Sequence, residues 1–443
     1  MKMGRAIKRA AIFSLLLMLG GCAAPEQFED FFTEEESPSS QKGHAEEEIS
    51  ENGYEITEGA DVEDGTGEPA QDTGAVVVLC ESINGLTQEE LDAWNRIGMN
   101  DLSVEKLREE QKGLYYYDRL EESQQLLYAE ILMILSQSEE NITVSETDGD
   151  RLDLVFQAVL ADHPEIFYVS GYSYTQYLLD SSVQRIRFTG TYTMTPEQIA
   201  AKQPEIDRYV AECLSGMPDG DDYVRLRYLY EYLIGHTDYI LNAPENQSIC
   251  SVFLYGQSVC QGYAKAYQYL CREAGVVATL VTGSIKETGY GHAWNLVVAD
   301  GDYYYVDITW GDASYTSGAD TVTANVPGIN YEYLCITTDQ IEQTHEIDTI
   351  VSMPYCTAIT DNFYVREQAY FTVFDTEALS ALFAQADPAR QNYVTFRCAS
   401  SDIYDQYRDY LITQQKIFLY MNSDRGISYS ENPVAQTLSF WLP

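Results

Sequence analysis

Basic residues are scarce in this sequence. Its 443 residues include 26 lysines and arginines against 70 aspartates and glutamates, which gives a formal net charge of -44 at pH 7. A surface with this charge repels phosphate backbones and anionic membrane faces, so nucleic acid is excluded as an expected partner. The sequence also lacks a phosphate-cradling glycine motif, a paired CxxC zinc pattern and a calcium loop. We therefore expect neither a cofactor nor a metal ion.

The remaining composition is typical of a globular protein, with 45% hydrophobic and 22% charged residues. A chain of this length exceeds one hydrophobic core, and two or three folded domains are expected. The sequence predicts five segments: a signal peptide over 1–21, an acidic tether over 22–75, an N-terminal α+β lobe over 76–194, a central domain over 195–350 and a small C-terminal α+β domain over 355–443.

The N-terminus has the layout of an export signal. Lysines and arginines within the first nine residues precede an apolar run over 10–19, which is too short to span a membrane comfortably. The run ends in Leu-Gly-Gly and Cys22, a sequence similar to the lipobox of bacterial lipoproteins, in which the cysteine carries the lipid. We expect Cys22 to anchor an exported chain on the outer face of the cell membrane. The alternative is a plain signal peptide that is cleaved at the small residues.

The segment over 22–75 is dense in glutamate, aspartate, serine and glycine, as in AEEEIS and DVEDGTGEP. Like charges at this density keep a segment from burying a core. We expect an extended, self-repelling tether between the anchor and the folded domains.

Hydrophobic periodicity predicts the elements of the N-terminal lobe and of the chain that follows it. Thr195, Pro196 and Gln198 together form a strong helix start. The predicted elements are helices over 118–136 and 152–161, hairpin strands over 166–177 and 183–193, helices over 195–214 and 222–234, and a polar loop over 235–258.

The C-terminal domain shows a similar alternation and carries no candidate site, so a packing or recognition module is expected. Its predicted elements are strands over 363–374, 393–398, 417–421 and 437–442 and helices over 376–386 and 402–411.

Residues 258–312 combine a thiol, an imidazole and a carboxylate, which together can carry nucleophilic chemistry. Apolar residues at helical spacing predict a helix over 261–274, which Gly275 ends. Cys260 then lies at the helix N-terminus, where the helix dipole favours a thiolate and lowers the pKa of a cysteine from about 8.5. The small Gly262 allows close approach of another segment.

The carboxylate is related to the imidazole by a predicted hairpin. Two apolar, aromatic runs over 292–299 and 302–309 flank Asp300-Gly301, a strong signal for a type I′ turn. Pairing residue 299 with residue 302 places Trp294 opposite Asp307 and residue 292 opposite residue 309.

In this register His292 and Asp307 share one face of the hairpin as diagonal neighbours. The carboxylate can therefore orient the imidazole, unless a one-residue bulge sends the aspartate to the opposite face. Only five histidines occur, and one lies in the tether. Of His163, His236, His292 and His345, only His292 lies on a strand whose hairpin partner carries a correctly facing acid.

Three blocks in this region carry a resemblance to a known family. GQSVCQGYAKAYQYLCREAGV, GYGHAWNLV and YYYVDITWGD occur in this order and resemble the motifs of the transglutaminase-like superfamily. The resemblance implies an α+β, papain-like core in which a helix that bears the cysteine packs on an antiparallel sheet. It further implies a triad of Cys260 as nucleophile, His292 as general base and acid, and Asp307 as orienter, with Trp310 and Asn295 at matching structural positions.

Members of this superfamily form a thioester on cysteine and pass the acyl group to an amine or to water. The resemblance thus predicts an exported enzyme that acts on protein or peptide amides, including substrates associated with the cell wall. Such chemistry needs an oxyanion donor, and the candidates are the Cys260 backbone N–H with help from Gln257 or Tyr239. The alternative from another class is a catalytically silent surface scaffold that keeps the fold and binds partners.

Overall fold

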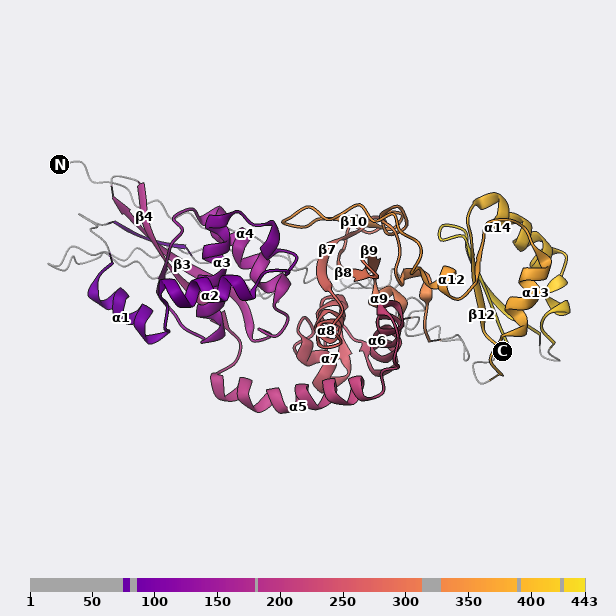
Figure 1. Cartoon of the computed structure of the whole chain (residues 1–443), viewed down its shortest axis with the longest axis horizontal. Helices are drawn as coiled ribbons and strands as arrows, with labels where there is room; N and C mark the ends of the chain where they lie inside the picture. The colour runs from indigo at the N-terminus through magenta and orange to yellow at the C-terminus, as the bar shows by residue number, and fades with distance from the viewer. Residues whose placement is uncertain are drawn as a thin grey trace, which may run out of the picture. The chain divides into compact units, whose positions relative to one another are not determined.

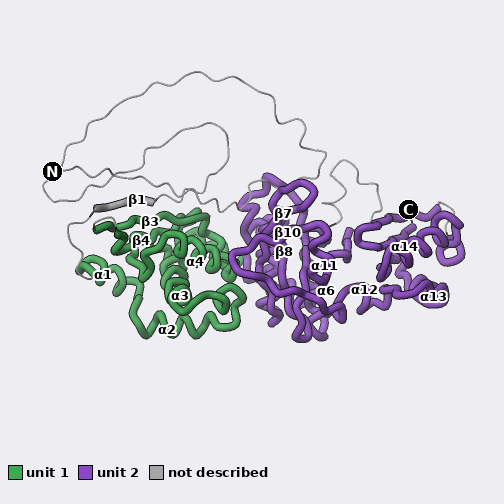
Figure 2. Tube along the Cα trace, turned by 90° about the horizontal axis from the view of Figure 1, so that it is seen from above, with its two compact units in different colours: residues 1–19, 28–205 green, residues 20–27, 206–443 purple. Residues whose placement is uncertain are grey.

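The computed structural model describes residues 75–79, 86–179, 182–312, 328–388, 392–422 and 426–442. The predicted signal peptide, Cys22 and nearly all of the predicted tether lie outside these residues. The chain divides into two compact units between Glu205 and Ile206 (Figure 2). The boundary between the units falls inside a helix that begins at residue 196. The second unit contains both the central and the C-terminal segment. The five predicted segments therefore stay a prediction.

The first unit combines a four-stranded sheet with helices. Phe156 lies in the core, where its ring packs 4.5 Å from that of Tyr172 and 6.1 Å from that of Phe188. Strands β3 and β4 form the predicted antiparallel hairpin. The sheet order is β1-β3-β4-β2, with β1 Ala75–Leu79, β2 Ile142–Val144, β3 Val169–Leu179 and β4 Ser182–Tyr192. The helices are α1 Gln88–Arg96, α2 Asp101–Glu110, η1 Tyr117–Arg119, α3 Glu122–Ser136 and α4 Gly149–Asp162.

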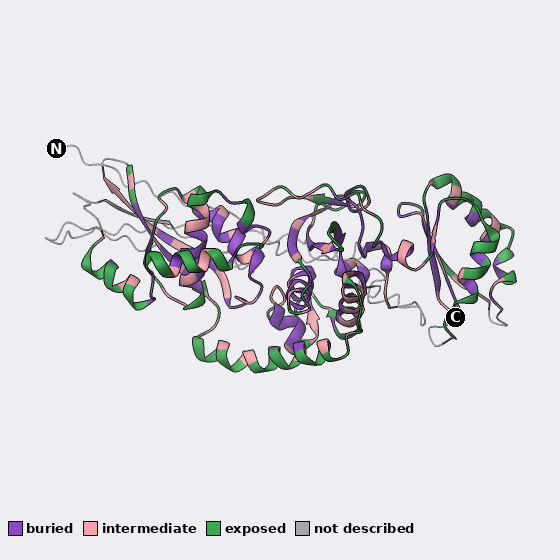
Figure 3. Cartoon of the chain, in the orientation of Figure 1, coloured by how far each residue is buried: buried purple, intermediate pink, exposed green. Residues whose placement is uncertain are grey.

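Two helices, α5 and α6, precede the helix that begins with Cys260. Helix α5, Pro196–Ser215, begins at the predicted cap, where Gln198 N donates to Thr195 Oγ1 at 3.4 Å. It buries only Ile206, Val210 and Cys213, and most of its surface is exposed (Figure 3). Helix α6 covers Asp222–His236. Among the described residues, none of the helices combines the length and apolar character needed to cross a membrane.

The central domain is a helix packed on an antiparallel sheet, which confirms the predicted α+β core. Helix α8, Cys260–Glu273, lies against β7 and β8 (Figure 1). Asn295 of β8 donates from Nδ2 to Ala264 O of α8 at 3.0 Å, and this buried bond ties the two layers together. The sheet order is β10-β7-β8-β9, with β7 Ala278–Ile285, β8 Gly291–Ala299, β9 Asp302–Val306 and β10 His345–Ile347.

The predicted hairpin forms from β8 and β9 in the predicted register. Asp300 and Gly301 have φ values of 49° and 92°, as a type I′ turn requires, and Ala299 pairs with Asp302. The pairing continues without a bulge to Asn295 opposite Val306. The predicted strand is wrong beyond this point, because the chain turns into the short helix α9, Ile308–Gly311.

The turn into α9 is caused by Asp307, whose carboxylate caps the helix by accepting from Trp310 N at 3.1 Å. Consequently neither the pair Trp294–Asp307 nor the pair His292–Thr309 is part of the β8–β9 ladder.

The predicted polar loop over 235–258 is also wrong in its middle. Ser248 accepts from Cys250 N and caps helix α7, Ile249–Tyr255, which buries Ile249, Val252 and Phe253. Two short parallel strands, β5 Asp238–Tyr239 and β6 Gln257–Ser258, flank this helix.

The C-terminal segment forms a sheet of order β11-β12-β14-β13 with helices. The predicted strand over 363–374 is confirmed only at Tyr370–Phe371, because Asn362 caps a helix at the beginning of this range. The predicted strand over 417–421 is wrong, since a 3₁₀-helix takes its place. The strand β13 was not predicted. The elements are β11 Tyr370–Phe371, β12 Val394–Cys398, β13 Ser428–Asn432, β14 Thr437–Trp441, α12 Phe363–Arg366, α13 Thr376–Ala384, α14 Ser401–Arg408, η4 Asp409–Thr413 and η5 Lys416–Leu419. The central segment also contains η2 Tyr331–Tyr333 and α11 Thr338–Ile341.

Candidate active site

Cys260 is the first residue of α8, directly after strand β6. Its N-cap, Val259, makes no side-chain hydrogen bond to the first turn. Gly262 permits a close crossing here, because a Cβ at this position would collide with Ser258 Oγ and lie 2.8 Å from Asn246 O. The local fold therefore holds the thiol at the positive end of a 14-residue helix.

The imidazole of His292 meets the carboxylate of Asp307. Nε2 of His292 lies 2.7 Å from Oδ2 of Asp307, and both side chains are fully buried. Since an ionised carboxylate can only accept, Nε2 of His292 carries the hydrogen. His292 also shares a hydrogen bond with Cys260. Because Nε2 is engaged by Asp307, this bond falls to Nδ1.

The electrostatics of this group favour a charged pair. Burial disfavours the imidazolium of His292, but Asp307 and Cys260 outweigh burial and raise its pKa from 6.5 to about 10. Burial would likewise raise the pKa of Asp307, yet His292 first and His345 second hold it well below its usual range. A proton on His292 and a negative charge on Asp307 are thus the stable arrangement at neutral pH.

His345 is the functional candidate that the sequence did not reveal. Its Nε2 lies 3.1 Å from the same Oδ2 of Asp307, and its Nδ1 lies 2.7 Å from Thr344 Oγ1. The residue comes from β10, which pairs with β7 rather than with the strand that leads to Asp307. His345 lies 38 residues after Asp307, on a strand of only three residues. Such a short strand has no hydrophobic periodicity by which the sequence could predict the contact with Asp307.

The remaining predicted residues surround this group. The ring of Trp310 lies 6.2 Å from that of His292 and 4.8 Å from that of His345. Asn295 is fully buried between β8 and α8. Tyr239 pairs with Ser258 and Gln257 pairs with Asp238 in the β5–β6 ladder that leads into Cys260. A role of Gln257 or Tyr239 as oxyanion donor stays a prediction.

The three side chains of His292, Asp307 and His345 also contain the donor types that bind metal ions, with their ligand atoms within 4.8 Å of one another. A tetrahedral zinc ion holds its ligands at about 2.0–2.1 Å, and therefore roughly 3.3 Å apart. The 2.7 Å between Nε2 of His292 and Oδ2 is too short for a shared cation and fits a hydrogen bond.

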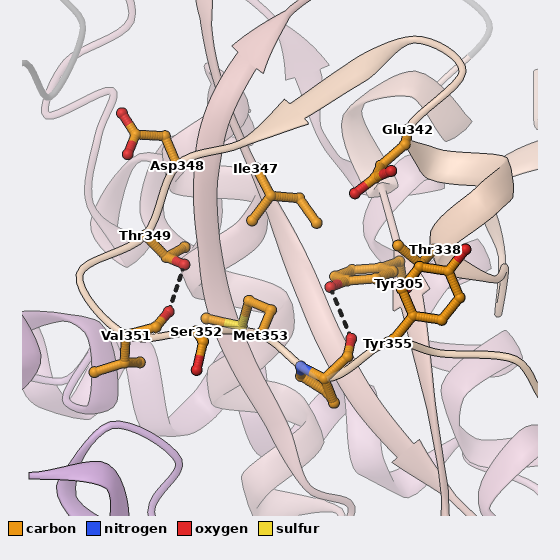
Figure 4. Close-up of a pocket in the computed structure, with 11 residues that line it drawn as sticks. Tyr305, Thr338, Glu342, Ile347, Asp348, Thr349, Val351, Ser352, Met353 and Tyr355 are labelled. Carbon is orange, nitrogen blue, oxygen red and sulfur yellow. Dashed lines mark hydrogen bonds between the residues drawn. The ribbon is translucent and has the colours of Figure 1, made fainter.

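A separate cavity of about 320 Å³ lies against the same sheet (Figure 4). Tyr305 and Ile347 contribute side chains to it, and Tyr305 donates to Pro354 O at 3.4 Å. Cys260, His292 and Asp307 are not among its lining residues. The cavity is thus distinct from the reacting group that the sequence predicts.

Comparison with known families gives a match over part of the central segment. Residues 212–308 match the model of the transglutaminase-like superfamily. The matched range contains Cys260, His292 and Asp307, whereas His345 lies outside it.

Curated relatives match over a limited length. The chain is 27% identical to the kyphoscoliosis peptidase of Homo sapiens over 155 residues, which are 32% of this chain and 22% of that protein. It is 28% identical to the kyphoscoliosis peptidase of Mus musculus over 131 residues, which are 26% of this chain and 19% of that protein. The chain thus spans about a fifth of the length of these relatives.

Among solved structures, a TGase shows 16% identity over 42% of this chain and 52% of its own, with a TM-score of 0.24. A candidate cysteine protease from Cytophaga hutchinsonii shows 13% identity over 32% of this chain and 62% of its own, with a TM-score of 0.21. TM-scores of this size add nothing to the family match.

Proposed function

We propose that the transglutaminase-like domain of this chain is a cysteine acyl-transfer enzyme that acts on protein or peptide amides. Cys260 is its nucleophile, His292 its general base and acid, and Asp307 the group that orients His292. The observation that supports this proposal most directly is the buried 2.7 Å contact between His292 Nε2 and Asp307 Oδ2, which leaves Nδ1 for Cys260.

The first half of the reaction forms a thioester. The thiolate sulfur of Cys260 attacks the carbonyl carbon of a carboxamide, and a C–S bond forms. The C–N bond then breaks, and His292 gives its Nδ1 proton to the departing amine. The backbone N–H of Cys260, at the start of α8, is the first candidate to bind the negatively charged oxygen in between, with Gln257 or Tyr239 as side-chain helpers.

The second half opens the thioester. Neutral His292 takes a proton from an incoming amine or water, the new C–N or C–O bond forms, and the C–S bond breaks to return the thiolate. Water as the acceptor gives hydrolysis, and an amine as the acceptor gives transfer. The same three residues serve both reactions.

The test is to incubate the full chain with protein substrates and a tagged primary amine. Incorporation of the tag supports transfer, whereas shortened fragments or deamidated glutamines support hydrolysis. Both outcomes should vanish in Cys260→Ala and persist in Cys271→Ala, because Cys271 lies on the same helix but deep in the core. Products that survive in Cys260→Ala would overturn the proposal.

A silent scaffold is the second candidate, and burial favours it. Cys260 has an exposed fraction of 7% and His292 one of 3%, so a substrate needs a movement of the covering residues to reach them. If Cys260→Ala left a cellular phenotype unchanged while deletion of 355–443 removed it, the scaffold would be the better account.

The proposed location is the outer face of the cell membrane, where Cys22 carries the lipid and the segment over 22–75 acts as a tether. Support comes from the lipobox-like sequence and from the density of negative charge. In a host that processes lipoproteins, Cys22→Ser should move the protein from the membrane fraction to the soluble fraction. Unchanged membrane association would contradict the anchor.

A further inference from the structure

We infer that His345 is a positioning residue for the proposed reaction: it donates Nε2–H to Asp307 and holds the shared oxygen in place for His292. The inference rests on the proposed function, since it concerns the group that orients the proposed base. It assigns a role to a residue outside the range that matches the family model, residues 212–308.

The proton positions follow from the acceptors. The carboxylate of Asp307 offers no hydrogen, so the Nε2 atoms at 2.7 Å and 3.1 Å from Oδ2 both donate to it. Burial lowers the pKa of His345 below 6.5 and outweighs its hydrogen bonds to Asp307 and to the backbone of Ile341, which raise that pKa. The imidazole is therefore neutral at neutral pH, and its one hydrogen is on Nε2. In this tautomer Nδ1 can accept the hydroxyl hydrogen of Thr344, whose Oγ1 lies 2.7 Å away.

His345 is the third donor to this carboxylate. Oδ1 of Asp307 receives the backbone N–H of Trp310 at 3.1 Å, and Oδ2 receives Nε2–H of His292 at 2.7 Å. Oδ2 lies between the two imidazoles, so His345 opposes any rotation that would lengthen the contact with His292. His345 also lowers the pKa of Asp307, because its N–H stabilises the negative charge of the buried carboxylate.

His345 is itself fixed by aromatic rings. Its ring centroid lies 5.0 Å from that of Trp294, 4.8 Å from that of Trp310 and 6.0 Å from that of Tyr333, and its side chain is fully buried. Such packing restricts the imidazole to one orientation, which is what a positioning residue requires.

The other titratable groups that face Asp307 are uncharged tyrosines or belong to the proposed triad. The hydroxyl of Tyr230 on α6 donates to Asn330 O at 2.7 Å and lies 3.5 Å from the backbone oxygen of Asp307, and Tyr333 belongs to η2. Burial raises the pKa of Tyr230 and of Tyr333 far above neutrality. A change in the titration of His292 upon substitution of His345 therefore reports on Asp307, which both imidazoles contact.

Two substitutions in the full chain separate the donor from the ring. His345→Phe keeps a planar ring in the aromatic surroundings but removes Nε2–H, whereas His345→Gln keeps an N–H donor at a similar reach. We would measure the pKa of His292 by NMR of histidine-labelled protein, with His292→Gln to assign the signal. Thermal unfolding would be recorded alongside.

In His345→Phe the pKa of His292 should fall by about one unit or more, a tenfold change in the imidazolium equilibrium. In His345→Gln the imidazolium equilibrium of His292 should stay within about threefold of its wild-type value. An unchanged or raised pKa in His345→Phe, or equal falls in both variants, would overturn the inference, even if both variants unfold at lower temperature.

Failure of the proposed function is visible separately. If the wild-type Cys260 reacted with iodoacetamide no faster than the other cysteines while the titration of His292 still responded to His345→Phe, the acyl-transfer proposal would fail and the positioning role of His345 would stand.

Discussion

At the scale of single residues, Asp307 performs three tasks. It caps α9 through Trp310 N, and it receives hydrogen bonds from His292 and His345. The three donors compensate for the loss of water around a fully buried carboxylate. A residue with these contacts couples the end of β9, the beginning of α9 and the protonation of His292.

Replacing Asp307 by asparagine should therefore change the titration of His292. In the wild type, the interactions of the His292 imidazolium raise its pKa to about 10. Their contribution to the stability of the fold is complete below pH 6.5 and is lost as the pH rises through 10. In Asp307→Asn the pKa should fall towards 6.5, and unfolding temperatures should lose this alkaline dependence. Turnover should fall by roughly 10²–10⁴-fold, the scale seen for orienting aspartates.

Asp312→Asn is the matched control for this change. Asp312 is also buried, and its carboxylate accepts from Tyr263 Oη at 3.0 Å. We expect a loss of stability with an unchanged titration of His292. A similar shift in both variants would contradict the role assigned to Asp307.

At the scale of elements, the β8–β9 hairpin was predictable because its signal is local. Asp300-Gly301 fixes the turn type, and alternation then fixes which side chains share a face. The end of β9 was not predictable by the same rule. Asp307 fits a strand by pattern, and only its bond to Trp310 N shows that it caps a helix instead.

The elements that the sequence analysis missed have short or ambiguous signals. Helix α7 has seven residues, and a run of this length does not distinguish a helix from a loop or strand. Strand β10 has three residues and joins the sheet beside β7, a pairing that depends on tertiary contacts. The prediction of Cys260, His292 and Asp307 needed only local patterns, whereas His345 needed the order of the whole sheet.

The attachment of β10 depends on a glycine in β7. A Cβ on Gly283 would collide with Glu346 O of β10 and lie 2.7 Å from Cη2 of Trp294. Gly283→Ala should therefore displace β10, carry His345 away from Asp307 and reduce the free energy of unfolding by roughly 1–3 kcal/mol. Denaturant unfolding followed by tryptophan fluorescence would measure this change.

Gly235→Ala provides the control, because nothing lies within 4 Å of a Cβ there and the residue belongs to helix α6. This variant should be neutral or more stable by about 0.5–1 kcal/mol. Equal losses in both variants would mean that the contact with Glu346 is not the cause.

At the scale of the whole molecule, the family match covers only residues 212–308, so the first unit and the C-terminal segment have no assigned role. Their excess of acidic residues contributes to the net charge of -44. Charge also enters the core of the first unit, where Glu130 accepts from Ser145 N and Oγ at 2.9 Å each. Burial raises the pKa of Glu130 from 4.5 to about 7.

This raised pKa predicts that the first unit becomes less stable as the pH rises. Below pH 4.5 Glu130 is protonated in both the folded and the unfolded state, and above pH 7 folding must bury its charge. Glu130→Gln should leave stability unchanged near pH 4.5 and increase it by up to about 3 kcal/mol at pH 8. Hydrogen exchange of residues 86–205 at the two pH values would measure the difference.

The matched control is Glu122→Gln, which changes an exposed glutamate on the same helix, α3. Glu122→Gln should change the free energy of unfolding only slightly, and by the same amount at pH 4.5 and at pH 8. A gain at pH 8 as large as that of Glu130→Gln would assign the effect to net charge rather than to burial.

The central claim is that Cys260 is an activated nucleophile, and selective alkylation tests it most directly. The full chain would be treated with limiting iodoacetamide at neutral pH, and the labelled cysteines would be identified by mass spectrometry. Cys271 is the internal reference, since it lies on the same helix and burial raises its pKa well above 9. We predict preferential labelling of Cys260, which Cys260→Ala abolishes and Cys271→Ala leaves unchanged; labelling spread equally over the cysteines would contradict the account.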